Sequence, residues 1–309
     1  MKNGNNADIN WVSRVGANRI GTIFFHRLIE MFGLRAAYLM LHFAAWQHVL
    51  LDKKSVSAIR DFRTRCGVPA GRYCIYRHFH SFGMSLIDRF YLTRTTGEGK
   101  FGFTYINEET IGREVQRGGG VILLGAHFGN WEIAGALLGK RLSKPVHVLM
   151  YDDRSEDPAG AAAGSEGIII HPVQADAADT AVEIINALRA GEIVCLHGDR
   201  YFTGQRKTAI DFLGSPASFP AGPMAMAMIT GASVIPCFTV RTSLFHYEFS
   251  AADPIRPEAA DRNLRDKAIR TAMEKYVRVL ETQCRKYPDQ WYNFYGYWMD
   301  RECFPEENG

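Results

Sequence analysis

The succession of apolar and polar positions divides the chain into a helical first third and an alternating remainder. Apolar residues recur at helical spacing through residues 12–66, and again, with many aromatic side chains, through residues 72–94. After the glycines at 118–120 the pattern changes to short apolar runs separated by helical segments. Strands that alternate with helices predict an α/β fold, with a mostly parallel central sheet flanked by helices.

The same pattern gives the individual elements and their grouping. A chain of 309 residues allows one large domain or two of ordinary size. No long linker separates two halves, so we interpret residues 1–100 as a helical, basic N-terminal region and residues 101–309 as an α/β domain, together forming one structural unit. We predict strands at residues 121–124, 146–151, 167–173, 192–197, 233–241 and 247–251, and helices at 131–141, 175–190, 219–230 and 261–286.

The most apolar part of the chain lies near its N-terminus. Residues 1–10 are polar and predict no secretory signal peptide, and residues 36–51 are apolar but interrupted by His42, Gln47 and His48. A helix that spans a bilayer needs about 20 predominantly apolar residues, so we expect this segment to lie on or in one leaflet. Apolar stripes rimmed by arginine and lysine suit the headgroup boundary, although two amphipathic helices packed on the protein's own core would show the same pattern. The stripes are Ile20, Ile23, Phe24, Leu28 and Met31, then Leu39, Phe43, Trp46 and Leu50.

Charge separates the same two regions. The whole chain carries a net charge of only +3, from 36 Lys+Arg and 33 Asp+Glu, and has no global basic field of the kind that binds nucleic acid. Residues 1–100 hold 15 basic and 6 acidic residues, a balance of +9, which leaves −6 for the remainder. This asymmetry indicates either a surface for an anionic partner, such as membrane phosphates, or a solvated basic face. The region has no zinc finger, RNA-binding aromatic motif or long basic run, so we expect no nucleic-acid partner.

Composition and cysteine spacing exclude several other classes. Hydrophobic residues make up 47% and charged residues 22%, which is typical of a globular protein and excludes a disordered chain or a coiled coil. The six cysteines form no Cys-x-x-Cys pair, and no Cys/His cluster has the spacing of zinc ligands, so we expect no metal site. A reducing compartment fits the scattered cysteines best.

The first motif with chemical meaning is Gly-Ala-His-Phe-Gly-Asn-Trp-Glu at residues 125–132, which follows a predicted buried strand and opens a helix. His127 and Glu132 are five residues apart, so on a continuous helix they would be separated by about 140°. A turn at Gly129 and Asn130, with Asn130 as N-cap, would bring the loop histidine to the first-turn carboxylate. The carboxylate would then hold the imidazole tautomer while His127 accepts a proton. A histidine at a strand end is also common as a purely structural residue.

Two further motifs follow along the chain. Asp199 and Arg200 come just after a predicted strand, at the edge where ligand sites of α/β proteins gather. The guanidinium of Arg200 suits phosphate or carboxylate, and a surface Asp–Arg pair would explain the sequence equally well. Residues 219–228, Phe-Pro-Ala-Gly-Pro-Met-Ala-Met-Ala-Met, are typical of a small-residue helix that packs closely on a sheet.

Taken together, these motifs resemble the lysophospholipid acyltransferase superfamily. The order His-x4-Glu (127–132), Gly-Asp-Arg (198–200), Phe-Leu-Gly (212–214), Phe-Pro-Ala-Gly-Pro (219–223) and Val-Ile-Pro (234–236) is similar to that of its lipid A late acyltransferase (lauroyl/myristoyl acyltransferase) branch, to which phosphatidylinositol mannoside acyltransferase is related. Residues 287–292, Tyr-Pro-Asp-Gln-Trp-Tyr, resemble the C-terminal block of that branch, and the basic amphipathic N-terminus resembles its membrane-docking region. The wider superfamily has Glu-Gly-Thr-Arg where this chain has Gly198-Asp199-Arg200, a departure that fits the lipid A branch better.

The resemblance implies an O-acyltransferase that needs neither cofactor nor metal. It would move a fatty acyl chain from an acyl thioester, acyl carrier protein or acyl-CoA, to a hydroxyl of a lipid or glycolipid, with His127 as general base and Glu132 as its partner. It would act at the cytoplasmic face of the bacterial inner membrane as a peripheral or monotopic protein. Backbone N–H groups of the 129–132 turn are one source of donors for the oxyanion. The residues implied to bind substrate are Asn130, Gly198, Asp199, Arg200, Gly214, Pro220 and Gly222.

Two other functions fit the same residues. An acyl thioesterase would use the dyad to activate water, and its release of thiol would not depend on added lipid. A non-catalytic, membrane-bound lipid-binding protein would have no chemical need for both His127 and Glu132. The chain has no Gly-x-Ser-x-Gly elbow, which argues against a serine acyl-enzyme route.

Overall fold

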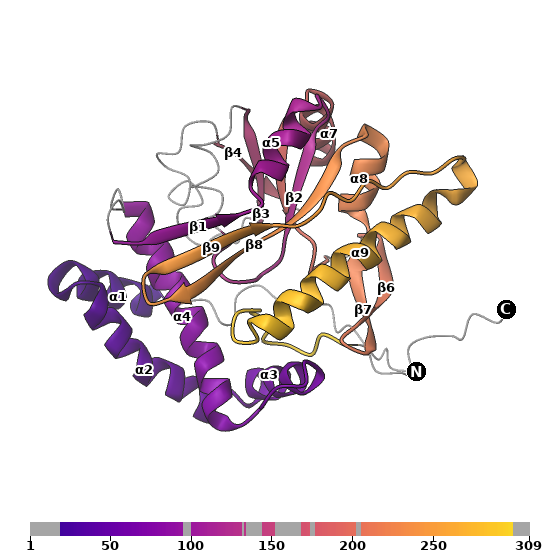
Figure 1. The fold of residues 1–309 in the computed structure, drawn as a ribbon. Helices are drawn as coiled ribbons and strands as arrows, with labels where there is room; N and C mark the ends of the chain where they lie inside the picture. Colours follow the sequence, from indigo (N-terminus) through magenta and orange to yellow (C-terminus); the bar gives the residue numbers. More distant parts are fainter. Residues whose placement is uncertain are drawn as a thin grey trace, which may run out of the picture.

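The structure, a computed structural model, describes residues 19–94, 100–131, 133, 144–151, 168–173, 177–201 and 205–298. Its first part is helical, as the apolar spacing predicts, and Figure 1 shows these helices grouped together on one side of the sheet. The helices are α1 (Arg19–Phe32), α2 (Leu34–Leu51), α3 (Lys53–Arg65) and α4 (Arg72–Arg94). The prediction of a helix over 72–94 is confirmed, and residues 12–18 of the first predicted stretch lie outside the described residues.

The remainder alternates strands and helices. The strands are β1 (Gly102–Ile106), β2 (Val121–Gly125), β3 (Val146–Tyr151), β4 (Ile168–Val173), β5 (Ile193–His197), β6 (Lys207–Phe212), β7 (Ser215–Pro220), β8 (Ser233–Ser243) and β9 (His246–Ala251). The helices are α5 (Glu109–Gln116), α7 (Ala177–Arg189), α8 (Gly222–Thr230) and α9 (Arg265–Lys286), the last preceded by a short 3-10 turn, η1 (Arg262–Leu264).

A mostly parallel sheet forms the centre of the molecule, which confirms the predicted fold class. Within the described residues it has seven strands in the order β1-β9-β8-β2-β5-β3-β4, and only the β8–β9 pair is antiparallel. The β6–β7 hairpin is a separate antiparallel pair that packs against α9. Strand β2 therefore lies beside β5 and β8, so the loops after all three strands can meet at one place.

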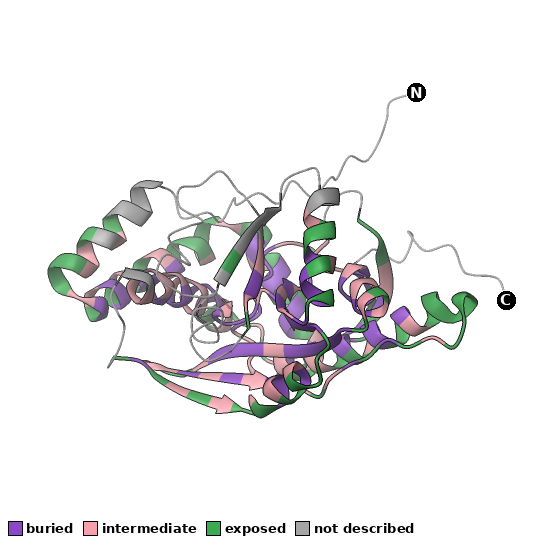
Figure 2. Cartoon of the chain, turned by 90° about the horizontal axis from the view of Figure 1, so that it is seen from above, coloured by how far each residue is buried: buried purple, intermediate pink, exposed green. Residues whose placement is uncertain are grey.

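The apolar run at the start of β2 is buried on both faces. Ile122 and Leu124 belong to a core cluster with residues of α7, α8 and α9, and Val121 and Leu123 belong to a second cluster with Ile111 of α5. This is the expected result for a parallel strand covered by helices on both sides. Figure 2 shows buried residues along the central strands and exposed ones on the outward sides of the helices.

Helix α2 packs on the rest of the protein with one face and leaves a second, apolar stripe exposed. It packs mainly against α4, with Leu34, Ala37, Tyr38, Leu41 and Ala45 buried. The stripe Leu39, Phe43, Trp46 and Leu50 is 40–70% exposed. Packing on the protein's own core, the alternative explanation of these apolar residues, therefore accounts for the first set but not for the stripe.

Some element predictions need correction. The predicted helix over 219–230 begins only at Gly222, because Phe219 and Pro220 pair with β6 as the end of strand β7. Strand β1, helix α5 and the β6–β7 hairpin were not predicted at all. These elements are short, and β1 is an edge strand whose residues alternate between exposed and half-buried, so their apolar signal is weak. Residues 134–141 of the predicted helix that starts at Trp131 lie outside the described residues.

Candidate functional site

His127 lies in the loop that leaves the carboxyl end of β2. In the parallel β2–β5 pair, Gly125 is the register partner of His197, so the residues after these two positions meet at the same edge of the sheet. This brings Asp199, two residues past the end of β5, beside His127. Ligand sites of open α/β sheets form at this edge.

The loop after His127 is held by backbone hydrogen bonds on two sides. The N–H of Gly129 donates to the carbonyl of Gln290 (2.7 Å), and the N–H of Asn130 donates to the carbonyl of Thr239 in β8 (2.8 Å). Gly129 has a φ of 60°, and a Cβ at this position would lie 1.9 Å from the carbonyl oxygen of Thr239. Glycine is therefore required here both by conformation and by the closeness of β8.

Asp199 and His127 form a buried acid–imidazole pair. The Asp199 carboxylate accepts hydrogen bonds from the ring Nδ1 of His127 (2.9 Å) and from its backbone N–H (3.0 Å). It also accepts one from the indole Nε1–H of Trp291 (3.2 Å). The Asp199 side chain is 1% exposed and the His127 side chain 22%. These contacts fix the tautomer with Nδ1–H on Asp199, so Nε2 is the nitrogen left to act as base.

The charges of the pair follow from its surroundings. Burial alone would raise the pKa of Asp199, but the neighbouring His127 and Arg200 outweigh burial and hold it well below its usual range. The carboxylate is therefore ionised at neutral pH. Burial lowers the pKa of His127, the positive charge of Arg200 lowers it further, and Asp199 partly offsets both. His127 is thus neutral at neutral pH, as a general base must be.

The C-terminal segment completes the surroundings of Asp199 and Arg200. The guanidinium of Arg200 donates from Nη2 to the carbonyl of Tyr292 (2.6 Å) and lies over the ring of Tyr295. The hydroxyl of Tyr297 donates to the backbone carbonyl of Asp199 (2.6 Å). From the sequence alone, residues 287–292 were identified only by their resemblance to a family block, without a role in the site. The sequence interpretation missed the direct hydrogen bond from Trp291 to Asp199. The available signal was that a buried indole N–H usually finds an acceptor.

A second histidine, which the sequence interpretation did not assign to the site, lies against the first. The ring centroid of His197 is 4.5 Å from that of His127, and the ring of Trp131 meets both rings edge-on at 5.4 and 5.3 Å. His197 and His127 are each partly exposed, whereas Gly198, Asp199 and Phe128 beside them are buried. Its place as the last residue of β5 was the available signal, because that strand ends at the same edge as β2.

Two of the predicted substrate-binding residues are buried in structural contacts. Asn130 is 3% exposed, and its side-chain amide donates to the carbonyl of Ser85 in α4 (3.0 Å). A Cβ on Gly198 would lie 2.9 Å from the ring of Tyr276 in α9, so glycine is required here by packing. Both residues hold the framework on which His127 and Asp199 lie.

The other predicted residues belong to the β6–β7 hairpin and α8, or lie outside the described residues. Gly214 forms the exposed turn of the β6–β7 hairpin, Pro220 is the buried last residue of β7, and Gly222 starts α8. Within the described part of the chain, no hydrogen bond joins any of the three to His127, Asp199 or Arg200. Glu132 lies outside the described residues.

The backbone donors expected for an oxyanion are already in use. The N–H groups of Gly129 and Asn130 donate to Gln290 and Thr239, so these two members of the 129–132 turn are not available to a substrate. This corrects the expectation for the first two residues of the turn, Gly129 and Asn130. The reason is the closeness of β8 and the 290–292 segment, which pair with the loop as strands would.

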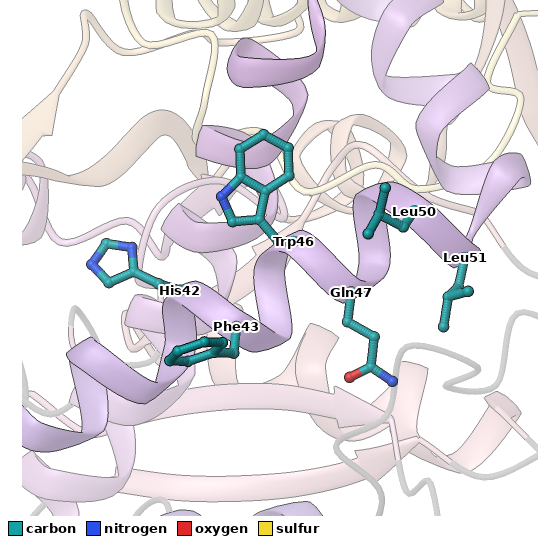
Figure 3. A pocket seen from close by; sticks show the side chains of 6 residues that line it. All are labelled: His42, Phe43, Trp46, Gln47, Leu50 and Leu51. Atoms are coloured by element: carbon teal, nitrogen blue, oxygen red, sulfur yellow. The ribbon is translucent and has the colours of Figure 1, made fainter.

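Helix α2 carries a separate apolar surface. A surface depression of about 430 Å³ is lined by His42, Phe43, Trp46, Gln47, Leu50 and Leu51, and Figure 3 shows that all these side chains come from this one helix. Met31 and Phe32 at the end of α1 are also exposed, by 71% and 66%. No helix in the described part of the chain is both long and apolar enough to cross a bilayer.

The described residues include no cluster of His, Cys, Asp and Glu that could hold a metal ion.

Comparison with known proteins gives consistent matches. A family described as bacterial lipid A biosynthesis acyltransferase matches residues 22–299 of the chain. The phosphatidylinositol mannoside acyltransferases of Mycobacterium tuberculosis strains CDC 1551 / Oshkosh and ATCC 25618 / H37Rv are each 28% identical to it over 127 residues. The matched stretch covers 38% of this chain and 37% of each relative, so the likeness to these two enzymes concerns little more than a third of their length.

Proposed function

Because the chain belongs to the bacterial lipid A biosynthesis acyltransferase family, we propose that it is an O-acyltransferase that moves a fatty acyl chain from an acyl thioester to a hydroxyl of a lipid or glycolipid. The observation that carries the proposal is the Asp199–His127 pair. A buried carboxylate on Nδ1 and a partly exposed ring leave Nε2 of His127 directed to a substrate as a general base.

The reaction needs one base and no covalent intermediate. Nε2 of His127 takes the proton of the acceptor hydroxyl as its oxygen attacks the thioester carbonyl. The carbonyl becomes a tetrahedral oxyanion, which collapses with cleavage of the C–S bond. The thiolate leaves and takes the proton back from the His127 imidazolium, so the products are an ester and a free thiol. Asp199 stabilises the imidazolium between these two steps.

Glu132, the family-implied partner of His127, has a different role in this proposal. The Nδ1 position is occupied by Asp199, so we assign the orienting carboxylate to Asp199 and keep Glu132 as a further acid of the same motif. Arg200 is the candidate contact for an anionic part of the substrate, such as a phosphate of the lipid headgroup or of the thioester carrier. Its positive charge lies close enough to His127 to lower the pKa of that ring.

The surface of α2 supports a membrane location for the acceptor. The apolar stripe of α2 is exposed, and exposed cations lie near it in the chain. They are Arg27 of α1, Arg35 of α2, and Lys53 and Lys54 at the start of α3. Such a surface fits an anionic headgroup layer. We place the protein at the cytoplasmic face of the bacterial inner membrane, where acyl carrier protein and acyl-CoA are present as donors.

The test is acyl transfer by the purified protein. Palmitoyl-CoA and palmitoyl-acyl carrier protein are each incubated with lipid A precursor, with phosphatidylinositol mannoside and with a bacterial lipid extract, and mass spectrometry detects any lipid that gains one acyl chain. His127→Ala should lose about 10²–10⁴ in rate, because general base catalysis contributes that much. Its melting temperature should stay close to that of the parent.

A thiol assay without lipid separates the alternatives. If thiol release is as fast without acceptor as with it, and no lipid gains a chain, the protein is a thioesterase and the proposal is wrong. If His127→Ala keeps activity within a few-fold of the parent, the base is wrongly assigned.

A further inference from the structure

The loop that carries His127 has committed its backbone donors. The N–H of His127 donates to Asp199 and that of Phe128 to the carbonyl of Ala126, at 3.0 and 2.6 Å. As described above, the N–H groups of Gly129 and Asn130 donate to Gln290 and Thr239. Four successive N–H groups around the base are thus paired. These four N–H groups are not available to a thioester oxyanion formed next to His127, which directs attention to the neighbouring side chains.

His197 has the required position. Its ring centroid is 4.5 Å from that of His127 with the planes tilted by 55°, and Trp131 supports both rings from the side. Both histidines are partly exposed at the same edge of the sheet. A molecule whose hydroxyl reaches Nε2 of His127 therefore also meets the ring of His197.

The chemistry of His197 also fits. Within the described part of the chain its ring nitrogens have no hydrogen-bond partner, unlike Nδ1 of His127. Burial, followed by the neighbouring His127, lowers the pKa of His197 to about 3, so the ring is neutral at neutral pH. A neutral imidazole still carries one N–H donor and one acceptor nitrogen. A neutral donor also avoids repulsion when the adjacent His127 becomes an imidazolium.

Arg200 is a cationic group whose charge also acts on both histidines. Its Nη2 donates to the carbonyl of Tyr292 and its guanidinium lies over Tyr295. These contacts hold the guanidinium against the C-terminal segment.

We propose that His197 is a catalytic residue that donates a hydrogen bond from its ring N–H to the oxyanion of the thioester carbonyl while His127 holds the acceptor's proton. The inference rests on the proposed acyl transfer. No proton is transferred to or from His197. The oxyanion gains a donor in the tetrahedral state, and the bond weakens again when the C–S bond breaks and the carbonyl re-forms.

The experiment compares substitutions that keep the ring with substitutions that keep the donor. His197→Phe retains an aromatic ring against His127 and Trp131 but has no N–H, whereas His197→Gln and His197→Asn place an amide N–H near the two ring-nitrogen positions. The readout is thiol release from palmitoyl-CoA, with and without the bacterial lipid extract. His246→Phe is the matched control, because His246 is a partly exposed histidine of β9 whose ring bonds to Thr104.

We expect His197→Phe to lower kcat by about 10²–10³, the usual effect of removing one oxyanion donor. At least one of the two amide variants should have a kcat about tenfold or more above that of His197→Phe. The KM for palmitoyl-CoA should change little, because the bond forms in the transition state and not with the bound thioester. The melting temperatures of all variants and the kcat of His246→Phe should stay near those of the parent.

Two outcomes would overturn the inference while leaving acyl transfer intact. One is a His197→Phe variant with nearly parental kcat, in a series where His127→Ala is inactive. The other is a loss in His197→Phe that neither amide variant recovers, at unchanged melting temperature. Parental turnover by His127→Ala, or no thioester turnover by the parent, would instead contradict the proposed function itself.

Discussion

The carboxylate of Asp199 accepts hydrogen bonds from both the ring Nδ1 and the backbone N–H of His127, 72 positions earlier in the chain. The two bonds fix the ring and the backbone of the same residue to one buried carboxylate. They are possible because β2 and β5 are neighbours in the sheet, although β3 and β4 separate them in the sequence. The orientation of His127, the proposed base, therefore depends on the sheet order, and not only on the local His-x4-Glu motif.

This relationship predicts a large effect for Asp199→Asn. The carboxylate serves three donors, from His127 twice and from Trp291 once, and a single amide oxygen cannot replace two charged ones. The amide also presents an N–H to Nδ1 in one orientation, which selects the wrong tautomer of His127. We expect kcat for acyl transfer to fall by about 10²–10⁴. Steady-state kinetics with palmitoyl-CoA, together with the melting temperature, measures the effect.

Glu132→Gln is the matched comparison for this prediction. It changes the carboxylate that the sequence motif favours, and we expect a smaller loss of kcat than in Asp199→Asn. An equal or larger loss in Glu132→Gln would return the orienting role to Glu132.

Most of the fold was predictable from the sequence because buried parallel strands give strong local signals. The apolar runs of β2, β5 and β8 are flanked by glycine and were placed within one or two residues of their ends. The β6–β7 hairpin was missed because apolar and polar residues hardly alternate along it. In addition, Pro216 and Pro220 are untypical of a strand. Its stability comes from packing against α9 and from aromatic contacts such as Phe212–Trp298, which local sequence does not contain.

The candidate site was predicted in part for the same reason. His127, Asp199 and Arg200 each follow an apolar strand, and the sequence identified all three as candidates. Their mutual arrangement was not predictable, because it depends on β5 lying next to β2 and on the C-terminal segment returning to this edge. His197 was overlooked because a strand-end histidine has no motif of its own.

Arg200 is predicted to control the pH dependence of the reaction. The rate should fall on acidification as His127 becomes protonated, and burial together with Arg200 lowers the pKa of His127 from its ordinary value of 6.5. The acidic limb of kcat/KM should therefore lie below pH 6.5 in the parent protein. Arg200→Gln removes one of the causes of the lowering, so its acidic limb should move to higher pH. Measuring kcat/KM between pH 5 and pH 8 tests this.

Arg200→Lys separates charge from geometry. It keeps the positive charge, so its acidic limb should stay near that of the parent, while KM rises because Lys cannot make two parallel hydrogen bonds to an anion. A parental KM and kcat in Arg200→Lys, with only a lower melting temperature, would assign Arg200 to holding the carbonyl of Tyr292.

The exposed stripe of α2 is predicted to dock on anionic membranes. Phe43 and Leu50 are 70% and 64% exposed, and burying each such side chain in lipid is worth about 1.5–3 kcal/mol. Phe43→Glu and Leu50→Glu should each lower the fraction of protein that floats with vesicles containing phosphatidylglycerol. Raising the salt concentration should release only part of the parent protein, since apolar burial adds to charge attraction.

Ile229→Glu is the control for docking. Ile229 of α8 is 58% exposed and lies outside the N-terminal helices, so its substitution should leave flotation unchanged. Equal flotation of Phe43→Glu, Leu50→Glu and the parent would show that α2 is not the docking surface.

His78 of α4 is predicted to make the fold sensitive to acid. It is 0% exposed, with Tyr292 and Phe294 edge-on to its ring. Burial lowers the pKa of His78 to about 4, and Arg63 lowers it further while Asp289 opposes the change. In the unfolded chain the ring titrates near its ordinary value of 6.5. Between these two values the unfolded state binds a proton that the folded state does not, so acidification favours unfolding.

The size of this effect can be measured by urea denaturation at several pH values. The free energy of unfolding should fall steadily as the pH is lowered from 6.5 toward about 4, because the unfolded chain binds a proton at His78 that the folded chain does not. His80 adds a contribution of the same sign, because burial lowers its pKa to about 4 as well.

Replacing His78 by Phe removes one titrating group from the core that supports Tyr292. The variant should therefore lose unfolding free energy between pH 6.5 and pH 5 less steeply than the parent, whatever its stability at pH 7. Parallel stability curves for parent and variant would show that His78 is protonated equally in the folded and unfolded states, and that the acid sensitivity of the fold arises elsewhere.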